Sequence, residues 1–340
     1  MENILVLTHA DETGSALTRA SLEAVTAGLE LANRLSAPIA IGIIASDATA
    51  ANVLASTGAR LLIVSGNALA QPRYATDAAA CEALCRAANA TIVLVSAGAR
   101  LARVAAGAAY RLGGVVDTHI TALGEADKIE ATRWFYRQRV EAIISRSMRP
   151  WVIVLDAGTQ TAYAGAPGAA SVEQVAIEMP ATRTTVTGIH APKQDEQTIR
   201  PDARMLLVAG AGWTKKQPDG QIHTSEAADL ILGFLRTTGA SLGSSKSLVD
   251  QGGEGQSVLP FLTHMNQIGQ TGATPRHAKG LSTCCHGEEP HVVGWRFISD
   301  RRAISLDPNC GWTRGKADVV YVADAFQVIK KLNELLAAKS

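Results

Sequence analysis

A short polar loop bracketed by glycine, QIGQTG at residues 267–272, gathers several hydrogen-bonding groups in six residues. It offers backbone amides, the carboxamides of Gln267 and Gln270, and the hydroxyl of Thr271. Such groups can stabilise negative charge that develops on the ring of a bound redox cofactor. On its own, a loop of this kind is more often a plain turn. Whether it binds a cofactor must therefore be judged from the motifs around it.

Three further motifs follow this loop: HGEEPH at 286–291, VVG at 292–294 and AISLDP at 303–308. With this spacing, the segment resembles the flavin-binding signature of the electron-transfer flavoprotein alpha subunit. In that family, QxGQTG leads through a buried strand into SGxxQH, then a glycine three residues on, then AxN followed by DP. The positions that match without a gap are Gly287, His291, Gly294, Ala303, Asp307 and Pro308. The chain is therefore identified as a divergent member of that family.

The resemblance implies that the second half of the chain binds FAD. Gln267, Gln270, Thr271 and Gly272 match residues that line the flavin, and the Thr271 hydroxyl would lie close to N5 and bias its redox states. His291 matches a histidine near the C2 carbonyl, where a positive partner would favour the reduced, anionic ring. A lone histidine is usually structural, but this one occupies a motif position.

Further family positions surround these. Ser245 matches the serine of the ASR motif, and Lys246 replaces its arginine, which keeps the charge but loses the planar fork. Asp324 matches an aspartate near the adenosine end of FAD, and a helix N-cap is an equally good interpretation of it. The predicted cofactor-binding residues are Gly210, Gly212, Ser245, Lys246, Gln267, Gln270, Thr271, Gly272, His286, Gly287, His291, Ser305 and Asp324.

Departures from the family pattern fall in the same site. The family's GRG is Gly210, Ala211 and Gly212 here, so the arginine that would meet the diphosphate is absent, and Lys215 or Lys216 would have to replace its charge.

The signature itself is also altered. His286 stands for its serine, Pro290 for its glutamine and Ser305 for its asparagine, and Arg301 departs from it as well. Glu288 and Glu289 add negative charge, which opposes diphosphate binding unless it is neutralised.

The resemblance implies an electron carrier rather than an enzyme with its own substrate. The chain would be the alpha subunit of a heterodimer with a beta subunit. It would take electrons from a flavin-dependent dehydrogenase of the acyl-CoA or N-methyl-amine type and pass them towards a quinone oxidoreductase of the respiratory pool. The departures motivate an alternative, a paralogue that has lost tight FAD binding and acts as a structural or regulatory partner of a beta subunit. A redox enzyme with its own substrate comes third, because no catalytic base is evident.

Other chemistry has weaker support. A metal site could be formed by Cys284, Cys285, His286 and His291, with His277 upstream. However, adjacent cysteines rarely both ligate one ion, and no second ligand pair with the usual spacing follows. We therefore expect no metal. Five cysteines without a CxxC motif indicate reduced thiols. No nucleophile triad or phosphate-binding GxxxxGK loop is present, so we expect no catalytic residues.

The elements that would position these residues alternate along the chain. From residue 3 to about 112, short apolar runs alternate with helical patterns, which predicts a parallel sheet covered on both faces. Strand-like pieces after Gly113 should extend that sheet. Asp117 and Arg133, which lie on these pieces, match family positions. We expect them to have a structural role, and they could also serve a subunit interface. A polar stretch with two prolines reads as a linker, and strands and helices restart beyond it.

We therefore predict an α/β protein of two doubly wound parallel-sheet domains. The N-terminal α/β domain, of the subunit-interface type, covers residues 1–184, the linker covers 185–202, and the flavodoxin/Rossmann-like FAD-binding domain covers 203–340. A length of 340 residues suits two domains.

Composition limits the partners and the location. A net charge of +1 leaves no broad field to attract nucleic acid. No apolar run approaches the roughly 20 residues that cross a bilayer, and the start of the chain lacks the pattern of a secretory signal. We expect a soluble, cytoplasmic protein that is not embedded in a membrane.

Overall fold

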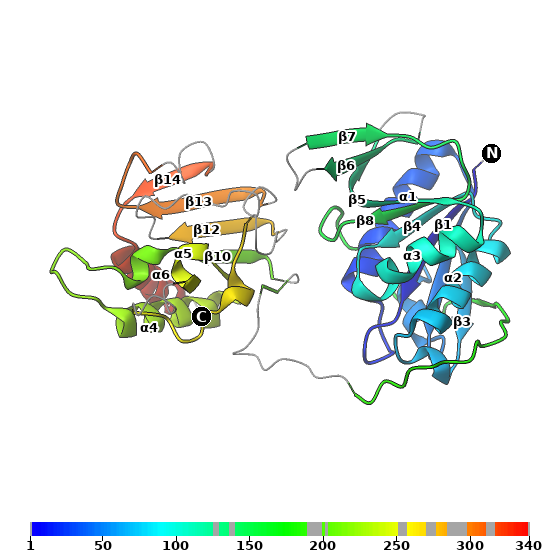
Figure 1. The fold of residues 1–340 in the computed structure, drawn as a ribbon, viewed down its shortest axis with the longest axis horizontal. Coiled ribbons are helices and arrows are strands. Elements are labelled where there is room, and N and C mark those ends of the chain that lie inside the picture. The colour runs from blue at the N-terminus through cyan, green and yellow to red at the C-terminus, as the bar shows by residue number, and fades with distance from the viewer. Residues whose placement is uncertain are drawn as a thin grey trace. The chain divides into compact units, whose positions relative to one another are not determined.

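The computed structural model describes residues 2–124, 129–135, 140–188, 199–200, 203–250, 257–269, 277–283, 298–310 and 317–338. The chain divides into two compact units, Met1–Ile189 and His190–Ser340, and each is described by itself (Figure 1). The predicted linker at 185–202 straddles this division, but residues 189–198 and 201–202 lie outside the described part. The domain limits at 184 and 203 therefore stay a prediction.

Unit 1 alternates strands and helices over its first half and adds antiparallel strands later. Its elements are β1 (Ile4–His9), α1 (Arg19–Leu35), β2 (Ile39–Ala45), the 3-10 helix η1 (Thr49–Leu54), β3 (Arg60–Ser65), η2 (Asn67–Leu69), α2 (Tyr74–Ala87), β4 (Ile92–Ser96), α3 (Ala99–Arg111), β5 (Val115–Leu123), β6 (Ala131–Phe135), β7 (Val140–Ile144), β8 (Trp151–Leu155) and β9 (Glu173–Gln174).

The described strands of unit 1 form one sheet in the order β7-β6-β5-β8-β4-β1-β2-β3-β9. Pairing is parallel except between β5 and β6 and between β6 and β7. The strand-like pieces after Gly113 therefore extend the sheet as predicted, with a hairpin at its edge.

Helices cover both faces of this sheet, as expected for central strands that are nearly continuous apolar runs. Val25 and Leu31 of α1 join the core cluster that includes Val6 of β1. Leu84 of α2 and Val104 of α3 belong to a second cluster, formed by the alternate residues of the same strands. Helices on both faces confirm the predicted doubly wound architecture (Figure 1).

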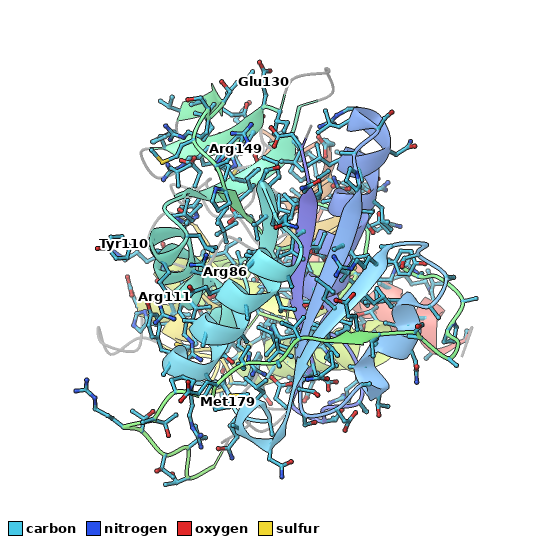
Figure 2. All side chains as sticks on the ribbon, turned by 90° about the vertical axis from the view of Figure 1, so that its right-hand side faces the viewer. Arg86, Tyr110, Arg111, Glu130, Arg149 and Met179 are labelled. Carbon is cyan, nitrogen blue, oxygen red and sulfur yellow. The ribbon has the colours of Figure 1, made fainter. Side chains whose placement is uncertain are left out.

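Glu82 links α2 with α3 near their carboxyl-terminal ends. Its carboxylate pairs with Arg86 at 2.8 Å and with Arg111 at 3.6 Å, and Figure 2 shows both arginines on these helices. The arginine side chains are well exposed, so each pair contributes less than about 1 kcal/mol. Apolar contacts with the strands are therefore the main force that holds this helix layer.

Asp117 of β5 is a buried charge of unit 1 with three side-chain partners. The carboxylate is 2% exposed, and it accepts from Arg146 at 2.8 Å, from Arg133 at 3.3 Å and from Nε1 of Trp151 at 3.0 Å. The hydrogen bonds from Arg146 lower the pKa of Asp117 although burial opposes this. Asp117 and Arg133 thus have a structural role within unit 1, and a role at a subunit interface stays a prediction.

Unit 2 contains a smaller sheet with helices against it. Its described elements are β10 (Met205–Ala209), η4 (Ala211–Thr214), α4 (Thr224–Thr238), β11 (Ser241–Ser244), α5 (Lys246–Asp250), η6 (His264–Asn266), β12 (Lys279–Thr283), β13 (Asp300–Ser305), β14 (Val319–Val322) and α6 (Ala325–Ala337).

The five described strands of this sheet are all parallel and lie in the order β11-β10-β12-β13-β14. Numbered along the chain, this is the flavodoxin-like order 2-1-3-4-5. Ile231 of α4 and Ile329 of α6 pack with Leu207 of β10 on one face, and Ile268 packs with Leu206 and Val208 on the other. The predicted α/β class is confirmed for this unit too.

Among the helices that the structure describes, none is both long and apolar enough to cross a bilayer.

Candidate functional site

The carboxyl edge of the unit 2 sheet contains a topological switch point. β10 lies between β11 and β12, so the connections that follow β10 and β12 leave the sheet in opposite directions. In open α/β sheets, ligands bind in the crevice outside the carboxyl ends of the strands at such a point. The amide of Gly210, just after β10, donates to the carbonyl of Thr283, the last residue of β12, at 3.0 Å. This bond closes the base of the crevice.

The loop after β10 is fixed by a buried tryptophan. Trp213 of η4 is completely buried, and its Nε1 donates to Oγ1 of Thr283 at 2.8 Å. Oγ1 of Thr283 in turn donates to the carbonyl of Val208 at 3.1 Å. The ring of Trp213 also packs on Phe326, with 4.6 Å between ring centroids. Gly210 and Gly212 therefore sit in a rigid turn against β12.

Ala211, between these two glycines, is 1% exposed. A buried methyl group thus occupies the position that the sequence resemblance matches to an arginine. The exposed residues Lys215 and Lys216 follow just after η4.

The start of the QIGQTG loop lies beside the end of β11. Gln267 and Ser244 form an isolated parallel bridge, and the amide of Ile268 donates to the carbonyl of Ser244 at 3.1 Å. Gly243 allows this approach, because a Cβ there would lie 2.9 Å from Cγ2 of Ile268. The side chain of Asn266 anchors the segment from the other side by donating to the carbonyl of Leu242 at 3.2 Å.

Ser245 and Lys246 follow β11 at the same edge. The amide of Ser245 donates to the carbonyl of Ala209 at 2.9 Å, and its Oγ accepts from the amide of Leu248 at 3.3 Å. Nζ of Lys246 lies 3.7 Å from the carboxylate of Asp250, and its side chain is about half exposed. The structure therefore brings Gly210, Gly212, Ser245, Lys246 and Gln267 to the carboxyl ends of neighbouring strands.

Ser305, the last residue of β13, and Asp324, just after β14, lie farther along the edge. Oγ of Ser305 exchanges hydrogen bonds with the backbone of Asp307, both at 3.2 Å. Asp324 caps α6, because its Oδ1 accepts from the amides of Phe326 at 2.7 Å and Gln327 at 3.2 Å. Both side chains have local structural partners, and the N-cap interpretation of Asp324 is confirmed.

The other predicted site residues, Gln270, Thr271, Gly272, His286, Gly287 and His291, lie outside the described residues, as do Cys284, Cys285 and the two glutamates of HGEEPH. Their roles remain predictions. Across the part of the chain that the structure describes, no group of three or more histidine, cysteine or acidic residues could hold a metal ion.

The cysteines correct one expectation. Cys310, which follows Asp307 in the loop after β13, is 1% exposed and disulfide-bonded rather than reduced. Cys81 and Cys85 of α2 are free and buried, and burial raises the pKa of Cys85 to about 12. A thiol with so high a pKa is unreactive at neutral pH.

Two groups that sequence reasoning missed belong to the edge. Oγ of Ser244, which is 0% exposed, has no hydrogen-bond partner among the described residues, although buried hydroxyls normally have one. The Trp213–Thr283 pair is the second. Ser244 precedes Ser245 in the chain, so its place at a strand end was a usable signal, whereas the pairing of Trp213 depends on which strands are neighbours.

The donor set at this edge fits the polar ring of a flavin better than it fits a diphosphate. Hydroxyls, a carboxamide and backbone amides lie at the switch point, and the orphaned Oγ of Ser244 is a buried polar atom that a bound group could satisfy. The only described cations beside them are Lys246, which is near Asp250, and the exposed Lys215 and Lys216. The arrangement can bind and orient a polar ring.

Comparison with known proteins locates the similarity mainly in unit 1. The family model for the electron transfer flavoprotein domain matches residues 6–181. No curated protein matches. Among solved structures, a protein from Mycobacterium smegmatis described as a thiamin diphosphate-dependent enzyme matches at 13% identity, over 98% of this chain and 60% of that chain. This chain therefore spans about three fifths of its length, and a TM-score of 0.23 is too low to support any argument from it.

Proposed function

Because the chain belongs to the electron transfer flavoprotein family, we propose that it is the alpha subunit of a heterodimeric electron carrier that holds FAD at the carboxyl edge of unit 2. The observation that carries this proposal is the isolated bridge between Gln267 and Ser244. It brings the start of the QIGQTG loop to the switch point of a sheet with the order 2-1-3-4-5, where such sheets bind their ligands.

In this proposal the residues of unit 2 bind and orient the cofactor, and FAD when bound supplies the electron chemistry. Gln267 and Ser244 offer a carboxamide and an unpartnered hydroxyl for the polar edge of the ring. Lys246, with Lys215 or Lys216, would supply positive charge for the diphosphate. The Trp213–Thr283 hydrogen bond keeps the loop after β10 in place, so the crevice is preorganised before the cofactor binds.

The partners follow from the family. A beta subunit would complete the heterodimer, a flavin-dependent dehydrogenase of the acyl-CoA or N-methyl-amine type would donate electrons, and a quinone oxidoreductase would accept them. The cytoplasmic location expected from the sequence stays a prediction.

A second candidate function is a family member without tight FAD binding that serves as a structural or regulatory partner. Three observations favour it. The arginine position is a buried alanine, Ala211, Lys246 lies near an acid, and Asp324 is committed to capping α6. A phosphate group left without cations would be bound weakly.

Cofactor content separates the two candidates. The chain should be co-purified with its candidate beta subunit, its visible spectrum recorded, and any released cofactor identified after denaturation. About one FAD per heterodimer would support the carrier. A colourless heterodimer that takes up no flavin from excess FAD would contradict it and favour the structural partner.

A further inference from the structure

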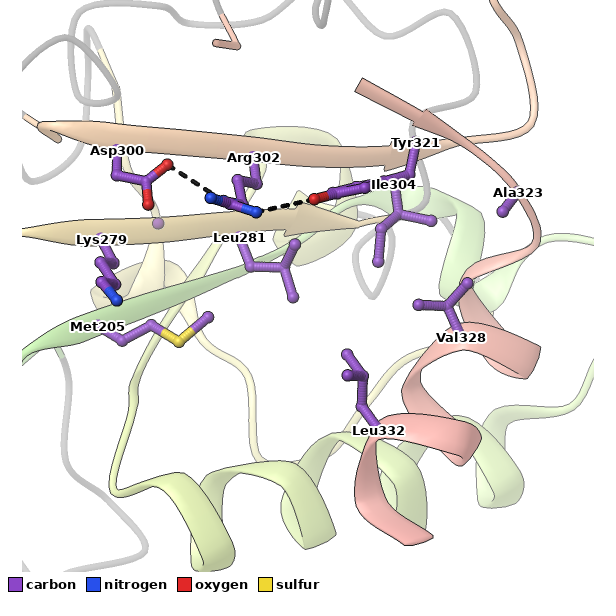
Figure 3. A pocket seen from close by; sticks show the side chains of 11 residues that line it. Met205, Lys279, Leu281, Asp300, Arg302, Ile304, Tyr321, Ala323, Val328 and Leu332 are labelled. Carbon is purple, nitrogen blue, oxygen red and sulfur yellow. Dashed lines mark hydrogen bonds and ion pairs between the residues drawn. The ribbon is translucent and has the colours of Figure 1, made fainter. Parts of the chain in front are cut away.

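A cavity of about 570 Å³ lies on the side of the unit 2 sheet that α6 covers. Leu281 and Ile304 line it from the strands, and Val328 and Leu332 of α6 line it from the opposite side (Figure 3). Its volume lies within the range of about 300–1,000 Å³ that is typical of small-molecule sites. The cavity is therefore large enough to be a binding site in its own right.

Arg302 makes this part of the sheet unusual. It occupies the middle of β13, in register with Leu281 of β12 and Val319 of β14, and its side chain lines the cavity. Its side chain is 49% exposed, so the guanidinium lies at the open rim of the cavity, where water solvates it. Parallel strands normally present apolar side chains to the helices that cover them, whereas this face of β13 presents a charge beside an apolar cavity.

Two neighbours hold the guanidinium of Arg302 against the sheet. Its Nε donates to Oδ1 of Asp300 at 3.2 Å, and its Nη1 donates to the hydroxyl of Tyr321 at 2.8 Å (Figure 3). A guanidinium has five N–H donors, so several remain for a ligand. The guanidinium is thus held in a fixed orientation and still has N–H groups that can donate to a ligand.

Lys279 adds a second positive charge at the same end of the cavity. It is the first residue of β12 and pairs in register with Asp300. Among the described residues, no acidic side chain forms an ion pair with it. The charges of Arg302 and Lys279 exceed that of Asp300 by one, so this end favours a ligand group with a single negative charge.

The rest of the cavity is apolar. Phe326 and Ile329 of α6 belong to the core cluster, and Val328 and Leu332, four residues apart, pack against that cluster and also line the cavity. In Figure 3, Ile304 of β13 and Ala323, which follows β14, lie at the opposite end from Lys279. The cavity therefore has a cationic end and an apolar end.

We propose that this cavity binds an amphipathic monoanion, a carboxylate on a linear apolar chain. Lys279 and Arg302 receive the carboxylate, because a guanidinium matches its planar geometry. The chain lies along Leu281, Ile304 and Val328. This function is separate from FAD binding and does not depend on it.

The test is a calorimetric titration of the full chain with decanoate. Decanoate should bind, and decylammonium, which has the same chain length with the opposite charge, should bind at least tenfold more weakly. Lys279→Gln should raise the dissociation constant of decanoate about tenfold, the effect of losing one hydrogen bond to a charged group. Lys330→Gln is the matched control, because Lys330 is an exposed lysine of α6 that does not line the cavity, and it should leave binding unchanged.

Two further measurements keep the proposal testable. Leu332→Trp fills the cavity and should abolish binding. If that variant fails to fold, a photoreactive decanoate analogue on the wild-type chain should label peptides from β12 and α6. Absence of binding, equal affinity for decylammonium, equal effects of the two lysine variants, or labelling elsewhere would overturn the proposal. So would loss of decanoate binding in the heterodimer, since a segment of the partner would then fill the cavity.

Discussion

Gly243 of β11 is the position where one added methyl group should disturb the candidate cofactor site most directly. A Cβ on this residue would lie 2.9 Å from Cγ2 of Ile268 and 3.3 Å from Cδ1 of Leu206. Carbon atoms pack best at about 3.5–4.0 Å, and the branched Ile268 cannot easily turn its Cγ2 away. Gly243→Ala should therefore push the segment that carries Gln267 away from the end of β11.

The expected magnitude combines two terms. Overpacking a well-packed core costs about 1–3 kcal/mol, and replacing glycine by alanine returns about 0.4–1 kcal/mol through the unfolded chain. We expect the free energy of unfolding to fall by about 1–2 kcal/mol. If Gln267 also loses one hydrogen bond to the flavin, the dissociation constant of FAD should rise about tenfold.

Urea unfolding followed by circular dichroism measures the first effect, and titration of the heterodimer with FAD measures the second. Ile268→Ala removes the clashing atom, so in a double-mutant cycle the two changes together should cost less than the sum of the single changes. Gly188→Ala is the control, because no atom lies within 4 Å of a Cβ there. The reasoning would be refuted if Gly243→Ala kept the stability and the FAD affinity of the wild type. It would also be refuted if the two changes in the double-mutant cycle were additive.

Three other predictions follow from buried groups. Asp117→Asn should lower the free energy of unfolding by about 2 kcal/mol at pH 7 in urea titrations, because it weakens charged hydrogen bonds. Because Arg146 lowers the pKa of Asp117, the wild type should lose this contribution as the pH falls below about 4, and a variant with the same pH dependence as the wild type would contradict this. Trp213→Phe keeps the aromatic packing but leaves Thr283 without a donor, so urea unfolding should show a loss of about 1–2 kcal/mol; an unchanged midpoint would show that the bond contributes little. Thiol titration of the denatured, unreduced chain should find three of the five cysteines free, since the disulfide of Cys310 uses two, and Cys310→Ser should raise that number to four; five free thiols in the wild type would contradict the disulfide.

The architecture could be predicted from the sequence because apolar periodicity is a local property. Strands such as ILVLTH and IAIGIIA of unit 1 are buried on both faces, so nearly every residue in them is apolar. The change of pattern after Gly113 likewise marked the strands β5, β6 and β7. The bulge of β5, where His119 has a φ of +60°, has no such signal, because it results from pairing with β8 and β6.

The candidate site was less predictable because its contacts join distant parts of the chain. The motif positions located Gln267 and Ser245, but the bridge from Gln267 to Ser244 exists only once η6 packs against β11. Asp324 had two equally good interpretations; the two amides of α6 confirm the cap, and a role near FAD stays a prediction. The motifs did not mark Arg302, and only its register with Leu281 places it on a face of the sheet.

The position of β10 in the middle of the unit 2 sheet affects how the protein is made. Leu207 pairs with Leu281, so the ribosome must add about seventy residues after β10 before its second neighbour exists. At about 5–20 residues per second, this takes roughly 4–15 s. During that time, an apolar strand destined for the centre of the sheet has one edge unpaired, which is a condition that favours aggregation. Unit 2 should therefore depend on chaperones during synthesis, and its switch point can form only after β12 has been synthesised.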